Sequence, residues 1–487
     1  MKLSGLLAGL VVLPEELETD LEIAGLSLDS RQIQAGYVFI ALHGEQHHGL
    51  HFAEQAIANG AVAILYESTA ATPVLNACCQ MIPVVDLGWR LGMIAARFYG
   101  MPSSQLRVIG ITGTNGKTSC SQLLAQVLPD CGVIGTLGWG QLPQLQPTLN
   151  TTPDALALQQ MLSYLLAHGT RAVAMEVSSH GLQQGRVQGV NFSGAVFTNS
   201  SRDHLDYHGS LEQYLQAKLS LFSMPGLEFA VVNLDDAKSS DVLAVLPAKV
   251  KPWTYSVSGR VLDPAASVWI SQAEYRNDGT RFVVNFAGQA QAGFVPLLGC
   301  FNLQNAMAVL TSLLAMGQCF DQAVMRLTTL KPIAGRMECF GGQGKPVVVV
   351  DYAHSPDALE QVLAALRGEG RLWVVFGCGG NRDRGKRAEM GRIAETLADS
   401  VIVTDDNPRQ EAPEAIVQDI IAGCRTDKVQ VIHDRAAAIQ VAIMQAGPQD
   451  CVVVAGKGHE NYQEINGVKW PFSDQEQVAR VLASWRQ

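Results

Sequence analysis

The fold class follows from one stretch, "LRVIGITGTNGKTSCSQLLAQVL", which runs from Leu106 to Leu128. An apolar run comes first, then a glycine-rich turn, then an amphipathic segment. This order predicts a buried strand, a tight loop and a helix. Short apolar runs rich in Val and Ile alternate with helical patterns along the rest of the chain. We therefore predict an α/β fold with largely parallel sheets.

The glycine-rich loop predicts an ATP site. Gly113 and Gly116 allow backbone N–H groups to approach phosphate oxygens, and Lys117 can reach the β- and γ-phosphates. Thr118 offers a hydroxyl to Mg²⁺ at the helix N-terminus. The usual G-x-x-x-x-G-K-[ST] spacing would place a glycine at position 111, where this chain has Ile111, so the loop is the shorter T-G-T-N-G-K-T.

The bulk composition excludes some classes of function. The chain has 487 residues, 47% of them hydrophobic and 16% charged, which is enough for about three globular domains. A net charge of −10 argues against a duplex-binding protein, because nucleic-acid binding needs a basic surface. The 10 scattered cysteines form no C-x-x-C pairs, so we predict reduced thiols and a cytoplasmic protein.

The first residues need a separate test, because "MKLSGLLAGLVVL" begins as a secretory signal would. The run continues directly into Pro14, Glu15 and Glu16 without an A-x-A-like cleavage site. We therefore expect a helix or strand of the first domain there. No stretch approaches the roughly 20 apolar residues of a membrane span, so we expect no membrane partner.

Two turn-rich segments divide the chain: "YGMPSSQ" before one new strand and "FGGQGKP" before another series of strands and helices. They predict three domains, at residues 1–102, 103–338 and 339–487. In the last of these, the strands "PVVVV", "LWVVF", "SVIVT" and "CVVVA" each lead into a polar loop. Those loops are "DYAHSPD", "GCGGNRDRGKR", "DDNPR" and "GKGHENY". Because ligands of open α/β sheets bind outside the carboxyl ends of strands, these loops should face one site.

A metal and phosphate site is predicted in the central third. Glu176 ends the apolar part of "AVAMEVSSHG", where an acid at a strand end can hold Mg²⁺. The segment "VFTNSSRDHLDYHG" then delivers several polar side chains just past another strand. Each of them alone would more often be a solvated loop residue, but their density favours a site. They are Asn199, Asp203, His204, Asp206 and His208.

Lys218 is expected to point inward. It lies in "SLEQYLQAKLSLF", which opens with the capping-box pair Ser210 and Gln213 and continues as a helix. Its helical spacing from Leu211, Tyr214, Leu215, Leu221 and Phe222 puts it on the apolar face. An inward lysine without a partner is costly. The residues leave three outcomes open: snorkelling to the surface, pairing with a phosphate, and conversion of the amine to a metal-binding anion.

These segments together resemble the Mur ligase family, the ATP-dependent amide-forming enzymes of peptidoglycan precursor synthesis. The motifs "TGTNGKT", "MEVSSHGL", "TNSSRDHLDYHG", "GCFNLQNAMA", "AGRME", "DYAHSPDAL" and "DDNPR" occur in the family's order. The resemblance runs from "LSLDSRQIQAGYVFIAL" to "AGKGHENYQ", nearly the whole chain. It implies an N-terminal domain for the uridine end of the substrate, a central P-loop ATPase-like domain, and a C-terminal Rossmann-like domain for the incoming amino acid.

The resemblance also assigns residues to ATP and Mg²⁺. The implied ATP-binding positions are Gly113, Thr114, Asn115, Gly116, Lys117, Thr118, Ser119, Asn302, Asn305, Arg336, Asp351 and His354. The implied catalytic positions are Lys117, Glu176, His204 and Lys218, and the implied metal positions are Thr118, Glu176, His204 and Lys218. In the family this lysine is carbamylated to N6-carboxylysine, which would turn a costly buried cation into an anion paired with metal.

Two further sets are implied for the other substrates. For UDP-N-acetylmuramoyl-L-alanyl-D-glutamate they are Leu28, Ser30, Glu45, Gln46, His47, Asn150, Thr151, Thr152, Ser178, Gln184 and Arg186. The loop "GEQHHG", which contains Glu45 to His47, differs from the commonest sequence of this loop in the family. For meso-diaminopimelate, which "DNPR" accompanies in the family, they are Arg382, Asp406, Asn407, Pro408, Arg409, Gly456 and Glu460.

The implied reaction joins these substrates in two steps. The D-glutamyl carboxylate attacks the γ-phosphorus of ATP, and the amine of the incoming amino acid then attacks the acyl phosphate. Closure of the C-terminal domain would exclude water from that intermediate. Small molecules are the expected partners, and a monomer is the expected state.

One alternative role for Arg409 and two alternative functions remain. An exposed arginine beside an Asn-Pro turn is usually only solvated, but a fixed guanidinium at Arg409 suits the second carboxylate of diaminopimelate better than the ammonium of L-lysine. A lysine-adding or other sister ligase, such as a folylpolyglutamate enzyme, is one alternative. A P-loop NTPase switch is another, since "VVNLDD" offers N-x-x-D but lacks the lysine of N-K-x-D.

Overall fold

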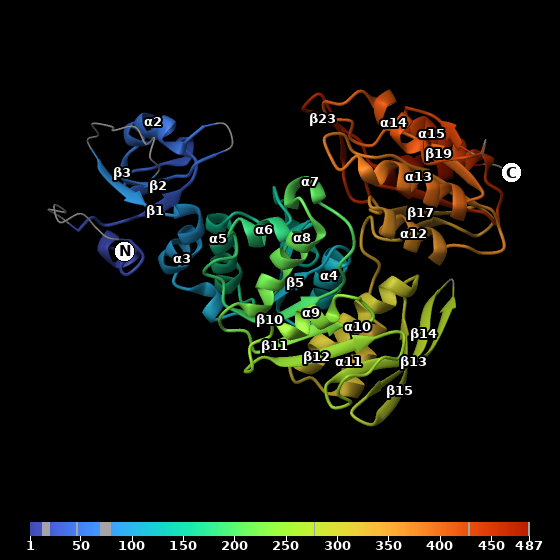
Figure 1. Ribbon diagram of the computed structural model, residues 1–487, viewed down its shortest axis with the longest axis horizontal. Helices are drawn as coiled ribbons and strands as arrows, with labels where there is room; N and C mark the ends of the chain where they lie inside the picture. Colours follow the sequence, from blue (N-terminus) through green and yellow to red (C-terminus); the bar gives the residue numbers. More distant parts are fainter. Residues whose placement is uncertain (12–19, 45–46, 69–78, 277, 427–428, 486–487) are drawn as a thin grey trace.

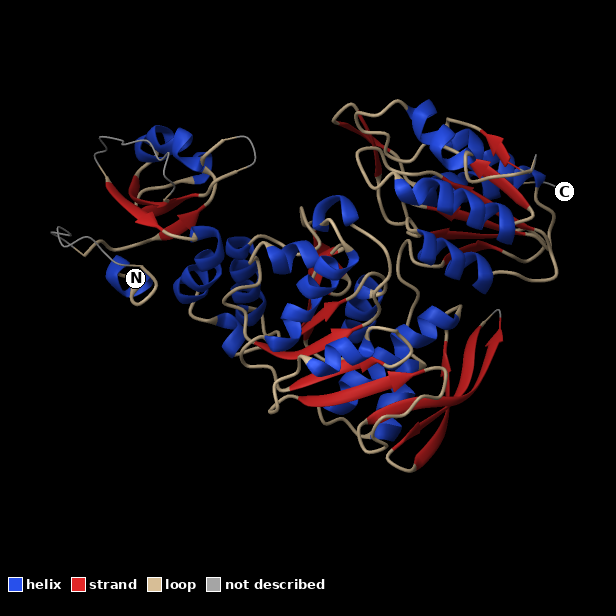
Figure 2. Cartoon of the chain, viewed as in Figure 1, coloured by secondary structure: helices blue, strands red, loops and turns tan. Residues whose placement is uncertain are grey.

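The computed structural model of the chain describes residues 1–11, 20–44, 47–68, 79–276, 278–426 and 429–485. Three units, each with its own sheet, follow one another along the chain (Figure 1). Strands flanked by helices make up each unit (Figure 2). The predicted α/β class is therefore confirmed.

The N-terminal unit is a parallel sheet in the order β1-β2-β3-β4. Its strands are β1 (Gly25–Ser27), β2 (Tyr37–Ala41), β3 (Ala61–Glu67) and β4 (Gln80–Val84), and its helices are α1 (Leu3–Leu7), α2 (Ala53–Ala58) and α3 (Leu87–Phe98). Buried Leu3, Leu6 and Leu7 pack with the sheet, so residues 3–7 of the first apolar run form a helix of this unit, one of the two predicted outcomes; residues 12–19 lie outside the described part of the chain.

The central unit is an eleven-stranded sheet in the order β15-β14-β13-β12-β11-β10-β5-β9-β6-β7-β8. Its strands are β5 (Arg107–Thr112), β6 (Cys131–Gly135), β7 (Gly138–Gln141), β8 (Gln144–Gln146), β9 (Ala172–Glu176), β10 (Phe192–Phe197), β11 (Phe229–Asn233), β12 (Lys251–Ser256), β13 (Ser267–Arg276), β14 (Gly279–Phe286) and β15 (Gln289–Val295). The strands from β6 to β13 in this order are parallel, whereas β7 and β8 at one edge and β14 and β15 at the other are antiparallel. The antiparallel edges were not predicted.

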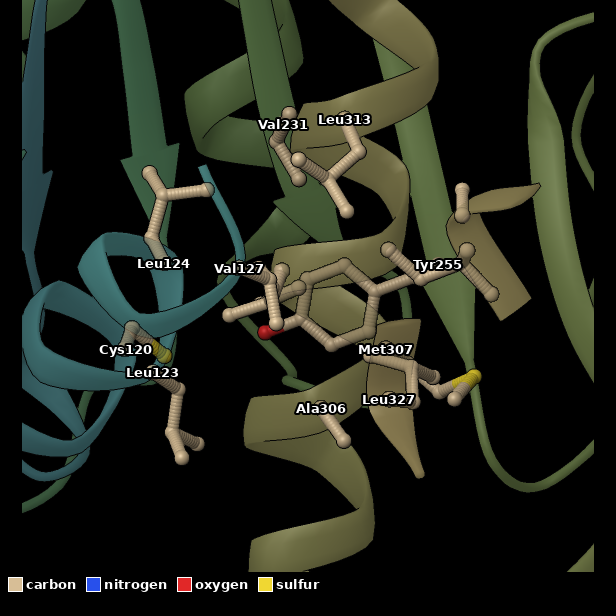
Figure 3. Close-up of a cluster of buried hydrophobic side chains, with 14 of the residues drawn as sticks. Cys120, Leu123, Leu124, Val127, Val231, Tyr255, Ala306, Met307, Leu313 and Leu327 are labelled. Carbon is tan, nitrogen blue, oxygen red and sulfur yellow. The ribbon is translucent and has the colours of Figure 1, made fainter. Parts of the chain in front are cut away.

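Helices cover both faces of this sheet. They are α4 (Lys117–Val127), α5 (Ala155–Ala167), α6 (Ser179–Gln183), α7 (Leu205–His208), α8 (Leu211–Leu219), α9 (Ser239–Ala244), α10 (Cys300–Ala315) and α11 (Phe320–Leu327). On one face, Leu123 and Val127 of α4 meet Met307 of α10 around the ring of Tyr255 (Figure 3). On the other face, Leu158 of α5 and Leu215 of α8 share a second core. Burial on both faces explains why the parallel strands are continuous apolar runs.

The C-terminal unit is a six-stranded sheet in the order β16-β17-β21-β18-β19-β20, parallel except for β16. Its strands are β16 (Glu338–Gly341), β17 (Val347–Asp351), β18 (Leu372–Phe376), β19 (Ser400–Val403), β20 (Val429–Val431) and β21 (Cys451–Ala455), and a separate hairpin consists of β22 (Tyr462–Ile465) and β23 (Val468–Pro471). Its helices are α12 (Pro356–Ala365), α13 (Gly385–Leu397), α14 (Pro413–Ile421), α15 (Arg435–Gln445) and α16 (Asp474–Ser484).

The four strands with polar loops, β17, β21, β18 and β19, are direct neighbours in this sheet. Their carboxyl ends therefore lie at one edge, as predicted. The domain boundaries stay predictions. The one proposed after residue 102 falls between α3 and β5, and the one after residue 338 falls inside β16. Among the described residues, no helix combines the length and apolar content needed to cross a bilayer.

Candidate active site

Two cavities at the carboxyl ends of the strands form one cleft between the central and C-terminal units. One has a volume of about 330 Å³ and is lined by the phosphate loop. The other has about 350 Å³ and is lined by the loops that follow β18, β19 and β21. The residues common to both walls are Asn150, Thr151, Asp203, His204, Tyr352, His354 and Arg382.

The phosphate loop has the conformation that its glycines predict. Gly113 and Gly116 have φ of 151° and 86°, and an added Cβ would lie 1.9 Å and 2.6 Å from side-chain oxygens of Thr198 and Asn305. The Lys117 ammonium donates to the carbonyl oxygens of Gly113, at 2.8 Å, and Thr114, at 3.0 Å. Burial lowers the pKa of Lys117. The lysine is thus held over the loop where phosphate oxygens would lie.

Glu176 ends β9 and is fully buried. Its carboxylate accepts from the Thr118 hydroxyl at 2.9 Å, from the Thr136 backbone N–H at 2.8 Å and from the Thr136 hydroxyl at 3.0 Å. The Thr136 hydroxyl also lies 3.0 Å from that of Thr151. The sequence interpretation missed Thr136; the signal for it was its position directly after the parallel strand "CGVIG".

Asp203 connects the two units. Its Oδ2 lies 3.5 Å from Nε2 of His204 and 3.8 Å from Nε2 of His354, which follows β17. Burial alone would raise the pKa of Asp203. The hydrogen bond and charge of His354, with the charges of His204 and Lys386, outweigh this effect and hold the pKa well below its usual range. Burial lowers the pKa of His204 to about 3. At neutral pH, an ionised Asp203 carboxylate therefore lies beside the neutral imidazole of His204.

Lys218 points inward, as predicted. Its side chain is 1% exposed, its Nζ has no hydrogen-bond partner among the described residues, and Nζ lies 2.9 Å from the centre of the Tyr214 ring. Burial lowers its pKa well below the usual value, and the charge of Lys117 adds to this. Lys218 does not snorkel, and Tyr214, not Lys218, lines the cleft. Ser210 caps α8 as expected, whereas Leu211, which was predicted to be part of the apolar face, is 53% exposed.

The remaining residues predicted to bind ATP, except His354, surround a cavity beside the phosphate loop. It is lined by Asn115, Gly116, Ser119, Asn302, Asn305, Arg336 and Asp351, among others. Arg336 donates to the Thr118 hydroxyl at 3.3 Å. Both oxygens of Asp351 accept backbone N–H groups, from Met337 and Ala353, at 2.8 Å. Asp351 therefore holds the junction between the two units, and Asn302 and Asn305 line the cavity beside the loop.

The residues predicted to bind diaminopimelate converge in the second cavity, which is lined by Arg382, Asp406, Asn407, Arg409, Gly456 and Glu460. Arg409 has φ of 53°, its Nη1 donates to Gly380 O at 2.8 Å, and its Nε lies 3.3 Å from Glu464 Oε2. The guanidinium is thus held in the cavity wall and is not simply solvated. Pro408 lies in the loop but not among the lining residues.

The residues predicted to bind the UDP substrate divide into two groups. Asn150, Thr151, Thr152, Ser178 and Arg186 line the cleft. Arg186 donates to Gln184 Oε1 and to Thr152 O, both at 2.8 Å, so Gln184 belongs to this group through its neighbour.

Leu28, Ser30 and His47 lie in the N-terminal unit and line neither cavity of the cleft. Ser30 donates to Gln55 at 2.7 Å, and His47 is exposed. Glu45 and Gln46 lie outside the described residues.

The polar residues of the cleft fit Mg²⁺ shared with phosphates. Within the described ranges, no three His, Cys, Asp or Glu side chains converge as a closed metal site. Mg²⁺ needs no such cage, because it usually keeps several waters and takes one or two carboxylates together with phosphate oxygens. The cleft offers Thr118, Glu176 and His204, and the orphaned Lys218 amine fits conversion to an anion.

Comparison with known proteins decides the family. Three family models match along the chain: "Mur ligase family, catalytic domain" at residues 22–99, "Mur ligase middle domain" at 111–313 and "Mur ligase, glutamate ligase domain" at 335–458. The chain belongs to the Mur ligase family. The family resemblance predicted from the motifs is confirmed.

Similar Mur ligases match this chain over nearly its whole length. A UDP-N-acetylmuramoyl-L-alanyl-D-glutamate--2,6-diaminopimelate ligase from Alkalilimnicola ehrlichii is 47% identical over 477 residues, 95% of each chain. One of the same name from Ectopseudomonas mendocina is 49% identical over 476 residues, 96% of each chain. A solved structure of a ligase of that name has a TM-score of 0.68 at 40% identity and covers 95% of each chain.

A more distant Mur ligase shares the fold. MurF ligase from Thermotoga maritima in complex with ADP has a TM-score of 0.66 at 19% identity, over 96% of this chain and 98% of that one. This likeness supports the three-unit architecture alone.

Proposed function

We propose that this Mur ligase joins meso-2,6-diaminopimelate to UDP-N-acetylmuramoyl-L-alanyl-D-glutamate with the conversion of ATP to ADP and phosphate. One observation carries the proposal: the loop with Arg409 and the phosphate loop face the same cleft, in a chain 47% identical over 95% of its length to a ligase of that name. The cleft offers a phosphate site and a carboxylate site within one enclosure.

The phosphates of ATP would lie on the loop from Gly113 to Ser119. Backbone N–H groups at the start of α4 and the Lys117 ammonium would hold the phosphate oxygens and stabilise charge on the transferred group. Thr118, Glu176, His204 and a carbamylated Lys218 would hold Mg²⁺, which as a Lewis acid neutralises the developing phosphoryl charge. Asn302, Asn305, Arg336, Asp351 and His354 would position the nucleotide.

The D-glutamyl carboxylate would lie between the phosphates and the cavity of about 350 Å³ that Arg409 lines, which we call the amino-acid cavity. Asn150 and Thr151 line both cavities, and Arg186 lies on the wall beside them. An arginine there would orient the carboxylate for attack on the γ-phosphorus. The N-terminal unit, through Leu28, Ser30 and the loop 45–47, would bind the uridine end. This span implies an extended substrate.

The second step requires an amine close to the acyl phosphate and no competing water. Asp406, Asn407, Arg409 and Glu460, with Arg382 and Gly456, would hold diaminopimelate by its polar groups. Contacts between units would exclude water: Asn115 donates to Asp357 at 2.9 Å, and Asp203 faces His354. A monomer acting on cytoplasmic small molecules suffices, with no role for nucleic acid or a membrane.

A single omission experiment tests the reaction class. Purified protein is given ATP, Mg²⁺, UDP-N-acetylmuramoyl-L-alanyl-D-glutamate and meso-diaminopimelate, with each component left out in turn, and phosphate and the coupled product are measured. We expect phosphate release to require both acceptors and to match the amount of product. Phosphate release at full rate without the acceptors would instead identify a P-loop NTPase switch.

A further inference from the structure

Lys457, which follows β21, is the buried cation beneath the amino-acid cavity. Its side chain is 0% exposed, and its Nζ lies 2.9 Å from Asn407 Oδ1 and 3.2 Å from Glu460 Oε2. Both partners line the cavity, whereas Lys457 does not. A fully buried lysine is rare unless it is paired, so both contacts stabilise it.

The contacts of Asn407 fix the orientation of its amide. Its Oδ1 accepts from the Lys457 ammonium and, at 2.9 Å, from the backbone N–H of Glu464. Both groups can only donate, so the oxygen must face them. The amide nitrogen then donates to Glu460 Oε2 at 2.8 Å and retains one further N–H. Asn407 therefore offers the cavity a donor, which suits a carboxylate.

The same lysine decides what Glu460 offers. Its Oε2 accepts from both Lys457 and Asn407, so Oε1 is the oxygen left for a ligand amine. The ammonium also balances the carboxylate charge. Without that balance, Glu460 would repel a substrate carboxylate beside it and attract an ammonium.

Through β22, these contacts reach the loop that carries Arg409. Glu464 donates its N–H to Asn407, its carbonyl accepts from the Arg409 N–H at 3.0 Å, and Arg409 O accepts from Asn466 N at 2.7 Å. Arg409 has φ of 53°, a strained conformation for a side-chain-bearing residue, so the loop depends on such ties. One of these ties is the hydrogen bond from Glu464 N–H to Asn407 Oδ1, the same oxygen that Lys457 contacts.

We propose that Lys457 is a positioning residue that sets amino-acid specificity: by orienting Asn407 and balancing Glu460, it makes the cavity favour a second carboxylate over a lone ammonium. The inference rests on the proposed function and deepens it. Lys457 acts only through Asn407 and Glu460 and touches no substrate.

The test compares two lysines that flank one ring. Nζ of Lys457 lies 5.7 Å and that of Lys469 4.3 Å from the centre of the Tyr462 ring, but Lys469 is exposed on β23. Lys457→Met and Lys469→Met remove the same charge with similar shape. Steady-state phosphate release is measured with meso-diaminopimelate and with L-lysine, and KM and kcat are obtained separately.

We expect Lys457→Met to raise the KM for diaminopimelate about 10- to 100-fold, the range for a lost hydrogen bond to a charged group, and to lower its preference over L-lysine. The KM for ATP should stay within about twofold, because the phosphate loop is untouched. Lys469→Met should match the parent. Two results for Lys457→Met overturn the inference. One is an equal rise of the KM for ATP and the KM for diaminopimelate, and the other is an unchanged preference for diaminopimelate over L-lysine.

Removing one partner of a buried ion pair can prevent folding, so a second variant is included. Lys457→Met combined with Glu460→Gln leaves no unbalanced charge and should fold, as measured by thermal unfolding, yet should still discriminate poorly. A folded double variant with the parental KM for diaminopimelate as well as the parental preference overturns the inference, because removing the Glu460 charge relieves only the repulsion and leaves Asn407 without its lysine. If the parent releases no phosphate in response to diaminopimelate, the proposed function is wrong and the inference fails with it. If the parent is active and Lys457→Met keeps the parental KM for diaminopimelate, the inference alone is wrong.

Discussion

Thr136 donates both its backbone N–H and its hydroxyl to the carboxylate of Glu176, at 2.8 Å and 3.0 Å. Thr136 directly follows β6, and Glu176 is the last residue of β9, the parallel strand beside it. Because the same hydroxyl lies 3.0 Å from that of Thr151, it links the acid proposed to hold Mg²⁺ to the loop proposed to hold the UDP substrate.

Thr136→Val should weaken both functions, because it removes the hydroxyl at constant shape while the backbone bond to Glu176 remains. We expect the Mg²⁺ concentration for half-maximal rate and the KM for the UDP substrate each to rise about 10-fold, the low end of the range for one lost hydrogen bond to a charged group. Thr136→Ser keeps the hydroxyl and is the matched control. Equal kinetics for the two variants would refute this role.

Lys218→Ala should reduce the rate by at least about 100-fold, because the proposed carbamate would supply a metal-binding anion that no neighbour replaces. Added acetate should restore part of the activity by entering the space left by the side chain. Lys331→Ala, at an exposed lysine, should show neither effect. Native mass spectrometry should find the parent heavier than its sequence by one CO₂. A Lys218→Ala variant with near-parental activity would show that the amine needs no modification.

Arg409→Ala should lose the use of diaminopimelate while retaining ATP binding. Removing a charged partner from a partly buried site costs about 2 to 5 kcal/mol, which corresponds to a roughly 30- to 5,000-fold lower kcat/KM. ATP binding is followed by calorimetry, and Arg480→Ala on α16 serves as the control. If Arg409→Ala added diaminopimelate at the parental rate, Arg409 would not be the carboxylate anchor.

The contrast between predicted and unpredicted features has a physical reason. The phosphate loop was predictable because Gly113, Gly116 and Lys117 act through local backbone geometry. The cleft was predictable because parallel strands bring their carboxyl ends to one edge. Thr136 and Lys457 were missed because Glu176 and Asn407, the residues they orient, lie 40 and 50 residues from them, and no local pattern marks such pairs.

Two further limits concern single elements. The antiparallel strands β14 and β15 lengthen the central sheet, but alternating apolar residues do not specify which sheet a hairpin joins. Leu211 fits the apolar spacing of α8 but is exposed because it lies in the first turn, ahead of the part that packs. Periodicity predicts a face of a helix and does not predict where its burial begins.

His459 should make the fold less stable in acid. Burial, with the charges of Arg336 and His354, lowers its pKa from 6.5 to about 3. Between these values the unfolded chain binds a proton that the folded chain does not, so stability falls as pH falls below 6.5. His459→Gln removes this dependence.

The measurement is urea unfolding of parent and variant at pH 7.5 and 5.0. Between pH 7.5 and 5.0, the free energy of unfolding of the parent should fall by up to about 2 kcal/mol more than that of His459→Gln. Between pH 7.5 and 9 the difference between the two proteins should stay constant. A parent that loses no more stability than the variant at pH 5.0 would contradict a buried neutral imidazole at His459.

The most direct test of the central claim is the ratio of kcat/KM for meso-diaminopimelate to that for L-lysine, measured by phosphate release with saturating ATP and UDP-N-acetylmuramoyl-L-alanyl-D-glutamate. L-lysine lacks the second carboxylate and would leave Arg409 without a substrate partner. Sites that hydrogen-bond a substrate group reject an analogue without that group by about 10⁴ to 10⁵-fold. We predict a ratio of at least about 10³ in favour of diaminopimelate. A ratio near one, or in favour of L-lysine, would contradict the proposed specificity.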